Sequence, residues 1–240
     1  MRYFFIKYHI LSEFNFLGFP CRISFRLLPL HFVLVLFFFS GRLSAGSWNS
    51  LQFRYQINEK WVFNAEAQLR SLRFYDHFHY HEYKAWMLYR LRPEVTLALG
   101  AGDYDTYGYG GDFVLPKNND EFRLWPQLQV LQNIGKVKIE HRYRFEMRFA
   151  DQGYRNRFRY RIQLNYPLFG AESQWSVQAS SELFFTNRAA YFERVRSQAG
   201  LNIKLNRHLS LLPGYLYQFD YRINDETGRD FVVMGLLISY

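Results

Sequence analysis

The segment KVKIEHRYRFEMRF (residues 136–149) alternates between two kinds of side chain, and YRNRFRYRIQLNY (154–166) repeats the alternation. In the first segment nearly every odd-numbered residue is apolar or aromatic, and every even-numbered residue is charged. A period of two places successive side chains on opposite faces of a β-strand and cannot form one face of a helix. The two segments therefore predict neighbouring strands with one apolar face and one charged face.

The length of this pattern indicates what lies on each side of the strands. Strands of water-soluble proteins usually contain about five or six residues, whereas the alternation continues through all of residues 136–149. A tilted strand that crosses a bilayer needs about nine to eleven residues, plus rim residues above and below. We therefore expect the apolar face to contact lipid and the charged face to line the inside of a closed barrel.

The composition agrees with a transmembrane β-barrel. Of the 240 residues, 20% are aromatic, with 25 Phe, 19 Tyr and 5 Trp, yet the mean hydropathy is only −0.28. After residue 45 no stretch approaches the roughly eighteen apolar residues of a transmembrane helix. The net charge of +9 does not indicate nucleic-acid binding, because the basic residues alternate with apolar ones and form no patch or helix stripe.

The N-terminal region has the order of a secretory signal peptide. Arg22 and Arg26 precede the apolar run LLPLHFVLVLFFFSG (27–41), and small residues follow near Ala45. The residues ahead of the run are more numerous than a normal basic region. We therefore predict a signal peptide with an over-long N-terminal extension over 1–45 and a single barrel domain over 46–240. Cys21 precedes the apolar run, so the mature chain is expected to contain no thiol and no disulfide.

Eleven alternating segments are candidate strands, and single-chain bacterial barrels have an even number of strands with both chain ends in the periplasm. We therefore expect ten to twelve strands, with one assignment in error, 48–57 being the most suspect. The candidates are residues 48–57, 61–72, 79–91, 94–103, 121–132, 136–149, 154–166, 174–185, 191–205, 208–221 and 230–240.

The connections between these segments form two classes. One class is mostly tight, namely 57–60, 92–94, 133–136, 205–208 and the somewhat longer 166–173; the other is longer or more polar, namely 73–78, 103–120, 150–153, 186–190 and 224–228. Outer-membrane barrels have short periplasmic turns and longer extracellular loops, which orients the chain. The last strand alternates up to the terminal aromatic Tyr240, a pattern typical of the signal that the barrel-assembly machinery binds.

Several blocks of the chain resemble a known family. They are WNSLQFRYQINEKW (48–61), NAEAQLR (64–70), EHRYRFEMRF (140–149), NRFRYRIQLNYPL (156–168) and SSELFF (180–185). These blocks are similar to the Bacteroidota outer-membrane β-barrel family catalogued as a domain of unknown function, number 2490. The resemblance covers essentially the whole mature chain and implies an outer-membrane barrel. It supplies no activity and no catalytic residues.

The inward face of the hairpin formed by 136–149 and 154–166 is rich in arginine. If Arg148 lies opposite Arg155, then Glu146 meets Arg157, and the remaining pairs join arginine to arginine, which is unfavourable. Acids elsewhere, water or an anion must balance this charge, and Glu66, Glu82 and Glu121 share the inward parity of their own strands. The predicted lumenal charge cluster is Glu140, Arg142, Arg144, Glu146, Arg148, Arg155, Arg157, Arg159, Arg161 and Glu182.

Two interpretations of this cluster stay open. In the first, ion pairs fill a small barrel, and the protein is a passive or structural membrane component. In the second, four arginines bind a small anionic solute or give a pore its anion preference, because guanidinium groups suit phosphate and carboxylate. They are Arg142, Arg144, Arg159 and Arg161. A barrel of ten to twelve strands is much narrower than a sixteen-stranded porin, so any conduction should be slight.

Three other groups of residues are candidate sites. His77, His79 and His81 share one face of an extended strand, where they could chelate a metal, but their parity is that of the lipid-facing residues, which favours an aromatic rim. Asp103, Asp105, Asp112 and Asp120 could bind Ca²⁺, but their spacing fits no EF-hand and favours a solvated loop.

The third is a lipid-hydrolase triad. Outer-membrane phospholipases pair an outward His with a Ser, but His141 is followed two residues later by Tyr143. We therefore expect no catalytic residues, no metal and no cofactor. The expected protein is a non-enzymatic component of the bacterial outer membrane, with a narrow anion-preferring pore as the first alternative and a surface lipid hydrolase as the second.

Overall fold

The structure is a computed structural model that describes residues 45–240 except 109–110, 171, 189–190 and 222–225. The predicted signal peptide and Cys21 lie outside the described residues. No helix in the described part of the chain is long and apolar enough to cross a membrane.

Eleven strands make up the described part of the barrel domain. They are β1 (Gly46–Gln56), β2 (Trp61–Arg73), β3 (Asp76–Arg92), β4 (Val95–Thr106), β5 (Asn119–Ile134), β6 (Val137–Ala150), β7 (Gly153–Pro167), β8 (Trp175–Thr186), β9 (Phe192–Lys204), β10 (Leu209–Asp220) and β11 (Thr227–Ser239). Each predicted segment corresponds to one of these strands, and 48–57 is the full strand β1. The strands are long because alternation persists until a turn residue interrupts it.

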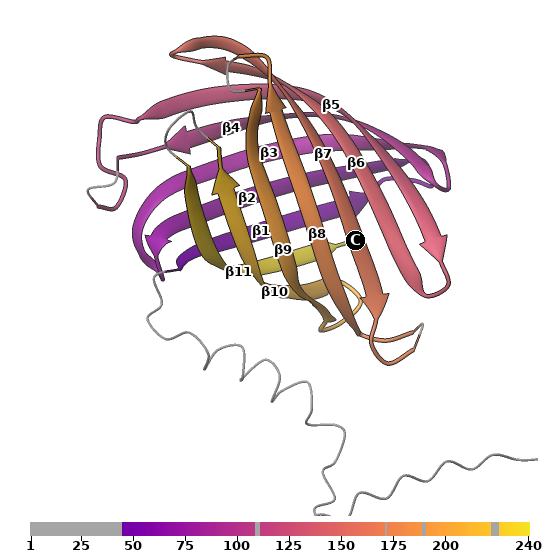
Figure 1. Cartoon of the computed structure of the whole chain (residues 1–240). Coiled ribbons are helices and arrows are strands. Elements are labelled where there is room, and N and C mark those ends of the chain that lie inside the picture. Colours follow the sequence, from indigo (N-terminus) through magenta and orange to yellow (C-terminus); the bar gives the residue numbers. More distant parts are fainter. Residues whose placement is uncertain (1–44, 109–110, 171, 189–190, 222–225) are drawn as a thin grey trace, which may run out of the picture. The chain divides into compact units, whose positions relative to one another are not determined.

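The strands close into one barrel in which every neighbour in sequence is also a neighbour in space. All sequential pairs are antiparallel, and β1 closes the barrel by pairing with β11 in parallel, from Gly46 opposite Phe231 to Arg54 opposite Ser239. Figure 1 shows the two strands side by side. The expected even number is therefore wrong. A parallel ladder also satisfies the edge groups of both strands, so an odd number of strands closes as completely as an even one.

An odd number of strands also separates the two ends of the domain. The end of the barrel that carries the connections 74–75, 107–118, 151–152, 187–191 and 221–226 is here called the loop end; the other, with 57–60, 93–94, 135–136, 168–174 and 205–208, is the turn end. Gly46 lies at the loop end and Ser239 at the turn end, so the two chain ends do not share a side as expected.

The turns form where local chemistry requires them. The Oδ1 atom of Asn58 accepts hydrogen bonds from the backbone N–H groups of Lys60 and Trp61, both at 2.9 Å. Asn206 repeats this arrangement in the connection 205–208. Gly135 has a φ of +58°, a conformation that a residue with a Cβ rarely adopts. These residues end the alternating segments and reverse the chain.

The outer face of the barrel is apolar. Tyr143, Phe145 and Phe158 on β6 and β7 are 38–41% exposed and are not covered by a second layer. Aromatic pairs lie near both ends of the barrel. At the loop end the ring centres of Phe149 and Tyr154 are 5.1 Å apart, and at the turn end those of Trp61 and Tyr89 are 4.8 Å apart. Apolar walls between aromatic girdles are typical of barrels that sit in a bilayer.

Candidate functional site: the lumen

The inside of the barrel contains a cavity of about 1250 Å³. Its lining comes from all eleven strands, from Lys60 and Glu94 at the turn end, and from Arg188 and Tyr221 at the loop end. Among the described residues that line it, seventeen are lysine or arginine and eight are aspartate or glutamate. The cavity is therefore polar and positively charged, as the inward parity of β6 and β7 indicated.

One side of the lumen is a dense layer of charge, here called the charged wall. It contains the inward-facing charged residues of β5 to β8, namely Glu121, Arg123, Glu140, Arg142, Arg144, Glu146, Arg148, Arg155, Arg157, Arg159, Arg161 and Glu182. The register of β6 with β7 is the one predicted, with Glu146 opposite Arg157 and Arg144 opposite Arg159. The ten residues of the predicted lumenal cluster all belong to this wall.

Glu146 is the centre of the charged wall, and none of its side chain is exposed. It accepts hydrogen bonds from Arg157 Nε at 2.8 Å and Arg159 Nη1 at 2.6 Å, and Arg144 Nη1 lies 3.8 Å away. One carboxylate thus separates three guanidinium groups. This arrangement relieves the arginine-to-arginine pairing across β6 and β7, since like charges opposite one another are otherwise unfavourable.

Glu182, on β8, neutralises the next part of the wall. It accepts two hydrogen bonds of 3.0 Å from Arg159 and one of 2.6 Å from Arg142 Nη2. Glu182 therefore binds arginines of both β6 and β7. Arg161 donates to Glu140 at 2.6 Å. The two parallel hydrogen bonds between Arg159 and Glu182 form the strong, bidentate type of ion pair.

Glu121 on β5 supplies the third centre. It accepts hydrogen bonds from Arg123 and Arg148, and Arg155 Nη2 lies 3.9 Å away. Glu193 on β9, which the sequence reasoning missed, lies 3.3 Å from Arg157 and 3.8 Å from Arg148. Its parity on 191–205 could have indicated an inward position, but which acid reaches which arginine depends on how the barrel closes.

Glu66 and Glu82, which share the inward parity of their strands, pair with cations of β2 and β3. Both lie within 2.9 Å of Lys84, and Glu82 also binds Arg70 at 2.9 Å. The four arginines considered for anion binding are also engaged: Arg142 and Arg159 by Glu182, Arg161 by Glu140, and Arg144 by Gln127 at 2.6 and 2.8 Å. A solute at these arginines would therefore compete with the protein's own side chains.

Aromatic rings fill the spaces between the guanidinium groups. Phe184 on β8 is fully buried, and the guanidinium carbons of four arginines lie 4.6–5.8 Å from its ring centre: Arg157, Arg159, Arg194 and Arg196. Trp125 on β5 is also fully buried beneath Arg144. Its indole lies against Gly100, where a Cβ would come within 2.6 Å of the ring. Cations within about 6 Å of an aromatic face are attracted to it.

The opposite side of the lumen is apolar and is here called the apolar wall. It comprises Trp48, Leu212, Leu216, Phe231, Val233 and Leu237, from β1, β10 and β11. Four of them, Trp48, Leu216, Phe231 and Val233, form one buried cluster, and Trp48 meets Phe231 edge to face at 5.4 Å. The sequence reasoning missed this wall. The signal was the unbroken apolar run of residues 231–238, which predicts a strand that is apolar on both faces.

The three histidines do not share a face. The ladder between β2 and β3 shifts so that Tyr80 pairs with Arg70 and Phe78 pairs with Ser71, and His79 is left between them as a bulge. A bulge residue changes the facing of the side chains before it, so His79 lines the cavity. His81 lies on the outer face, 3.1 Å from Tyr107 Oη, and His77 contacts Asp76. The expectation of a common face is wrong.

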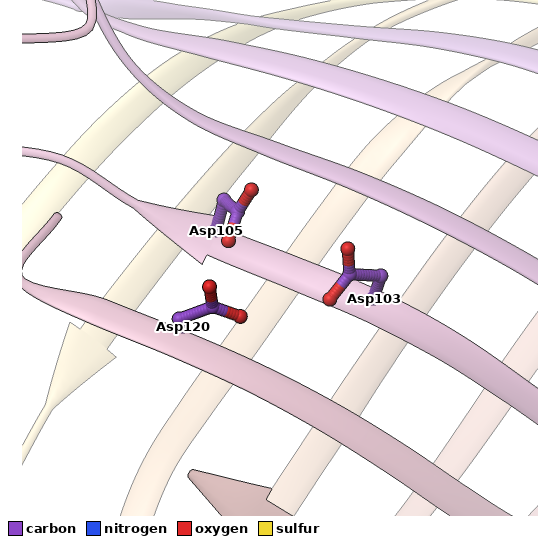
Figure 2. Close-up of side chains that lie close together, drawn as sticks. All are labelled: Asp103, Asp105 and Asp120. Carbon is purple, nitrogen blue, oxygen red and sulfur yellow. The ribbon is translucent and has the colours of Figure 1, made fainter. Parts of the chain in front are cut away.

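Three of the four aspartates considered for a cation come together at the loop end. Figure 2 shows Asp103 and Asp105 on β4 beside Asp120 on β5, with carboxylate oxygens within 4.8 Å of one another. Lys117 Nζ bridges Asp105 at 2.9 Å and Asp120 at 3.0 Å, and these hydrogen bonds raise the pKa of Lys117 above its usual value. Asp112 accepts from the backbone of Phe78 instead. An ammonium group therefore already binds two of the three carboxylates.

His141 lies on the outer face, where its Nδ1 atom is 2.8 Å from the hydroxyl of Tyr160. Ile162 is its partner across β7, as the predicted register requires. Ser181 is the next residue in that row, on β8, so a whole strand separates it from the histidine. The hydrogen bond with Tyr160 gives the Nδ1 atom of His141 a polar partner on the outer face.

Comparison with known proteins places the chain in a family. No curated protein matches it. Among solved structures, an anion-selective porin from Comamonas acidovorans is similar at 14% identity and a TM-score of 0.36, over 72% of this chain and 51% of the porin. The chain thus spans about half the length of that porin. Residues 45–229 match the family model described as "Protein of unknown function (DUF2490)". That match covers most of the barrel, and the chain belongs to the DUF2490 family.

Proposed function

We propose that the protein is a non-enzymatic component of the bacterial outer membrane whose lumen is a narrow, water-filled passage that prefers anions. The observation that carries the proposal is the cavity of about 1250 Å³ with its excess of basic over acidic lining residues. The apolar outer face and the aromatic pairs near both ends support a place in a bilayer with lipid as a partner. Small anionic solutes are the proposed passengers.

The orientation follows from the two ends of the barrel. The longest connection, 107–118, is at the loop end, and we place that end outside the cell because outer-membrane barrels have their longer loops there. The turn end is then periplasmic. The last strand, with Tyr240, is the segment through which we expect the barrel-assembly machinery to recognise the chain; Tyr240 donates its backbone N–H to Arg54 at 2.9 Å. No observation favours lipid hydrolysis over the passive role.

Ion preference is expected to depend most on cations at the mouths of the lumen, because each arginine of the charged wall already lies within 4.0 Å of a carboxylate. Arg54 lines the turn-end mouth and interacts electrostatically with Arg90 and Glu140. An anion that enters from this side meets Arg54 and Arg90 before it reaches the interior. Fixed charge in a low-dielectric mouth raises the local concentration of counter-ions.

The test is the reversal potential of the purified barrel in planar bilayers across a KCl gradient. We expect chloride selectivity in the wild type and a severalfold smaller chloride preference after Arg54→Glu. Arg207→Glu is the matched control, because Arg207 is exposed in a turn at the same end and does not line the cavity. Cation selectivity in the wild type, or equal effects of the two changes, would contradict the proposal.

A further inference from the structure

Arg196 on β9 differs from the other arginines around Phe184. Arg157 and Arg159 bind Glu146, and Arg194 binds Asp220. Arg196 has no carboxylate oxygen within 4.0 Å among the residues that the structure describes. Its one hydrogen bond there joins Nε to Gln218 Oε1 at 2.8 Å. Its two Nη atoms have no acceptor in this part of the chain, and the residue lines the cavity.

The neighbours of Arg196 explain why no acidic group of the described residues pairs with it. Glu182 lies directly across from Arg196 on β8, but the Glu182 carboxylate is committed to Arg142 and Arg159. On the other side, β10 places an amide, Gln218, opposite Arg196. Gln218 itself donates to Asp220 at 2.8 Å. A cation held inside a protein without an acidic partner needs water or an anion to satisfy its donors.

Two rings hold the Arg196 guanidinium in place. Its central carbon lies 4.8 Å from the centre of the Trp48 ring and 4.8 Å from that of Phe184. These ring contacts use none of the Nη hydrogens in a hydrogen bond, so within the described part of the chain the two Nη groups remain free to donate to a ligand. Together these groups form a fork whose geometry matches a carboxylate or a phosphate.

The apolar wall begins beside this cation. Trp48 belongs both to the wall and to the contact with Arg196. Leu216 on β10 lies two residues from Gln218, on the same inward face, and Leu212 and Leu237 continue the wall toward the turn end. Apolar side chains in a water-filled lumen gain free energy when an apolar solute covers them. The cation and the wall together are complementary to one molecule with an acidic head and an apolar chain.

We propose that the lumen binds a single-chain amphiphilic anion, with its acidic head on the Nη atoms of Arg196 and its alkyl chain along Leu216, Leu212 and Leu237. This inference rests on the proposed function only in that the lumen must admit anions from water. The cavity of about 1250 Å³ exceeds the several hundred Å³ of ordinary small-molecule sites. The head group is a carboxylate or a phosphate, since one fork serves both.

Binding can be measured calorimetrically with octanoate and the full barrel in phosphatidylcholine nanodiscs, with empty nanodiscs as the correction for partition into lipid. Octanoate should bind at least about tenfold more tightly than butanoate, since each buried methylene contributes roughly 0.8 kcal/mol, about fourfold in affinity. Octyl phosphate should compete with octanoate, and inorganic phosphate should compete weakly. An uncharged analogue, 1-octanol, should show no dependence on Arg196. Equal affinity for butanoate and octanoate would remove the role of the apolar wall.

Two variants separate the site from general effects of charge. Arg196→Gln should weaken octanoate binding roughly tenfold or more, the usual scale for a hydrogen-bonded charge. Gln218→Glu retains Arg196 and supplies it with an internal carboxylate, so it should weaken octanoate binding to a similar extent. Arg188→Gln removes a lining cation at the loop end that donates to the backbone of Tyr154, and it should have little effect.

Octanoate affinity that is unchanged in both Arg196→Gln and Gln218→Glu would overturn the inference, as would an equal loss in Arg188→Gln. Folding of each variant is checked by the shift in gel migration between heated and unheated samples. Octanoate binding with the expected dependence supports the inference even if the barrel conducts no ions. That combination would overturn only the proposed passage.

Discussion

The two walls of the lumen are stabilised in opposite ways. The charged wall on β5 to β8 buries ion pairs, and Glu146 is enclosed by three arginines. The apolar wall on β10, β11 and β1 buries hydrocarbon side chains, which pack against one another in a single cluster. Each charge of the first wall depends on particular neighbours, because a buried charge without its partner is costly. The second wall depends on volume and close packing.

This difference also indicates where a ligand can act. Each arginine of the charged wall lies within 4.0 Å of a carboxylate. Arg196, by contrast, stands where the two walls meet and has only an amide, Gln218, as its hydrogen-bond partner among the described residues. A surface that is polar on one side and apolar on the other is complementary to a solute that is itself amphiphilic. The boundary between the walls is therefore the most informative part of the lumen.

The largest effect is expected from Glu146→Gln. The change leaves Arg157, Arg159 and Arg144 close together without the carboxylate that separates them, and breaking a buried ion pair by removing one partner costs about 3–5 kcal/mol. The free energy of unfolding, measured in urea with the barrel in lipid vesicles, should fall by that amount. The control is Glu172→Gln, at an exposed turn residue. Wild-type stability for Glu146→Gln would mean that the wall is not a coupled network.

A smaller loss is expected from Leu216→Ala in the apolar wall. Leu216 is 4% exposed and packs in the cluster with Trp48, Phe231 and Val233, and such truncations cost about 2–5 kcal/mol in protein cores. We expect the lower part of that range, because the cavity beside Leu216 admits water. This change should leave the reversal potential in a KCl gradient unaltered. A shift in ion preference would show that the two walls are not independent.

Gly214→Ala tests close packing near the same wall. A Cβ at Gly214 would lie 2.8 Å from the backbone oxygen of Ala199 and 3.2 Å from the Cα of Gly200, so β9 and β10 would have to separate. Overpacking of this kind typically costs about 1–3 kcal/mol. Gly108→Ala is the control, because a Cβ there meets nothing within 4 Å. Urea unfolding that is equal for the two variants would contradict the close approach of the strands.

The smallest effect is expected at the loop end, where Lys117 bridges Asp105 and Asp120. Because the pKa of Lys117 is raised in the folded protein, its contribution is fully present below the unfolded value of about 10.4 and is lost as the pH rises through the folded value. Hydrogen exchange of the backbone amides of 117–120 should therefore show less protection at pH 11 and above than extrapolation from pH 9 predicts. Lys117→Gln should abolish that pH dependence; its persistence would assign the change to another group.

The amino-acid sequence by itself determined the strands, their two faces and the pairing of β6 with β7. These features are local: a period of two, an Asn or Gly at several of the turns, and a hairpin whose register follows from its connection. The predicted segments therefore correspond to the observed strands, and Arg144 faces Arg159 as predicted. The apolar run at 231–238 also contained its own signal, although alternation elsewhere concealed it.

Only the tertiary structure decided how the barrel closes and which charges meet. The first strand, β1, pairs in parallel with the last strand, β11. No local sequence pattern specifies this pairing. The same holds for the bulge that turns His79 inward, for the sharing of Glu182 between Arg159 and Arg142, and for the contact of Arg196 with Trp48 across the lumen, none of which a period of two specifies. Side chains on strands distant in sequence become neighbours only when the number of strands and their stagger are set together.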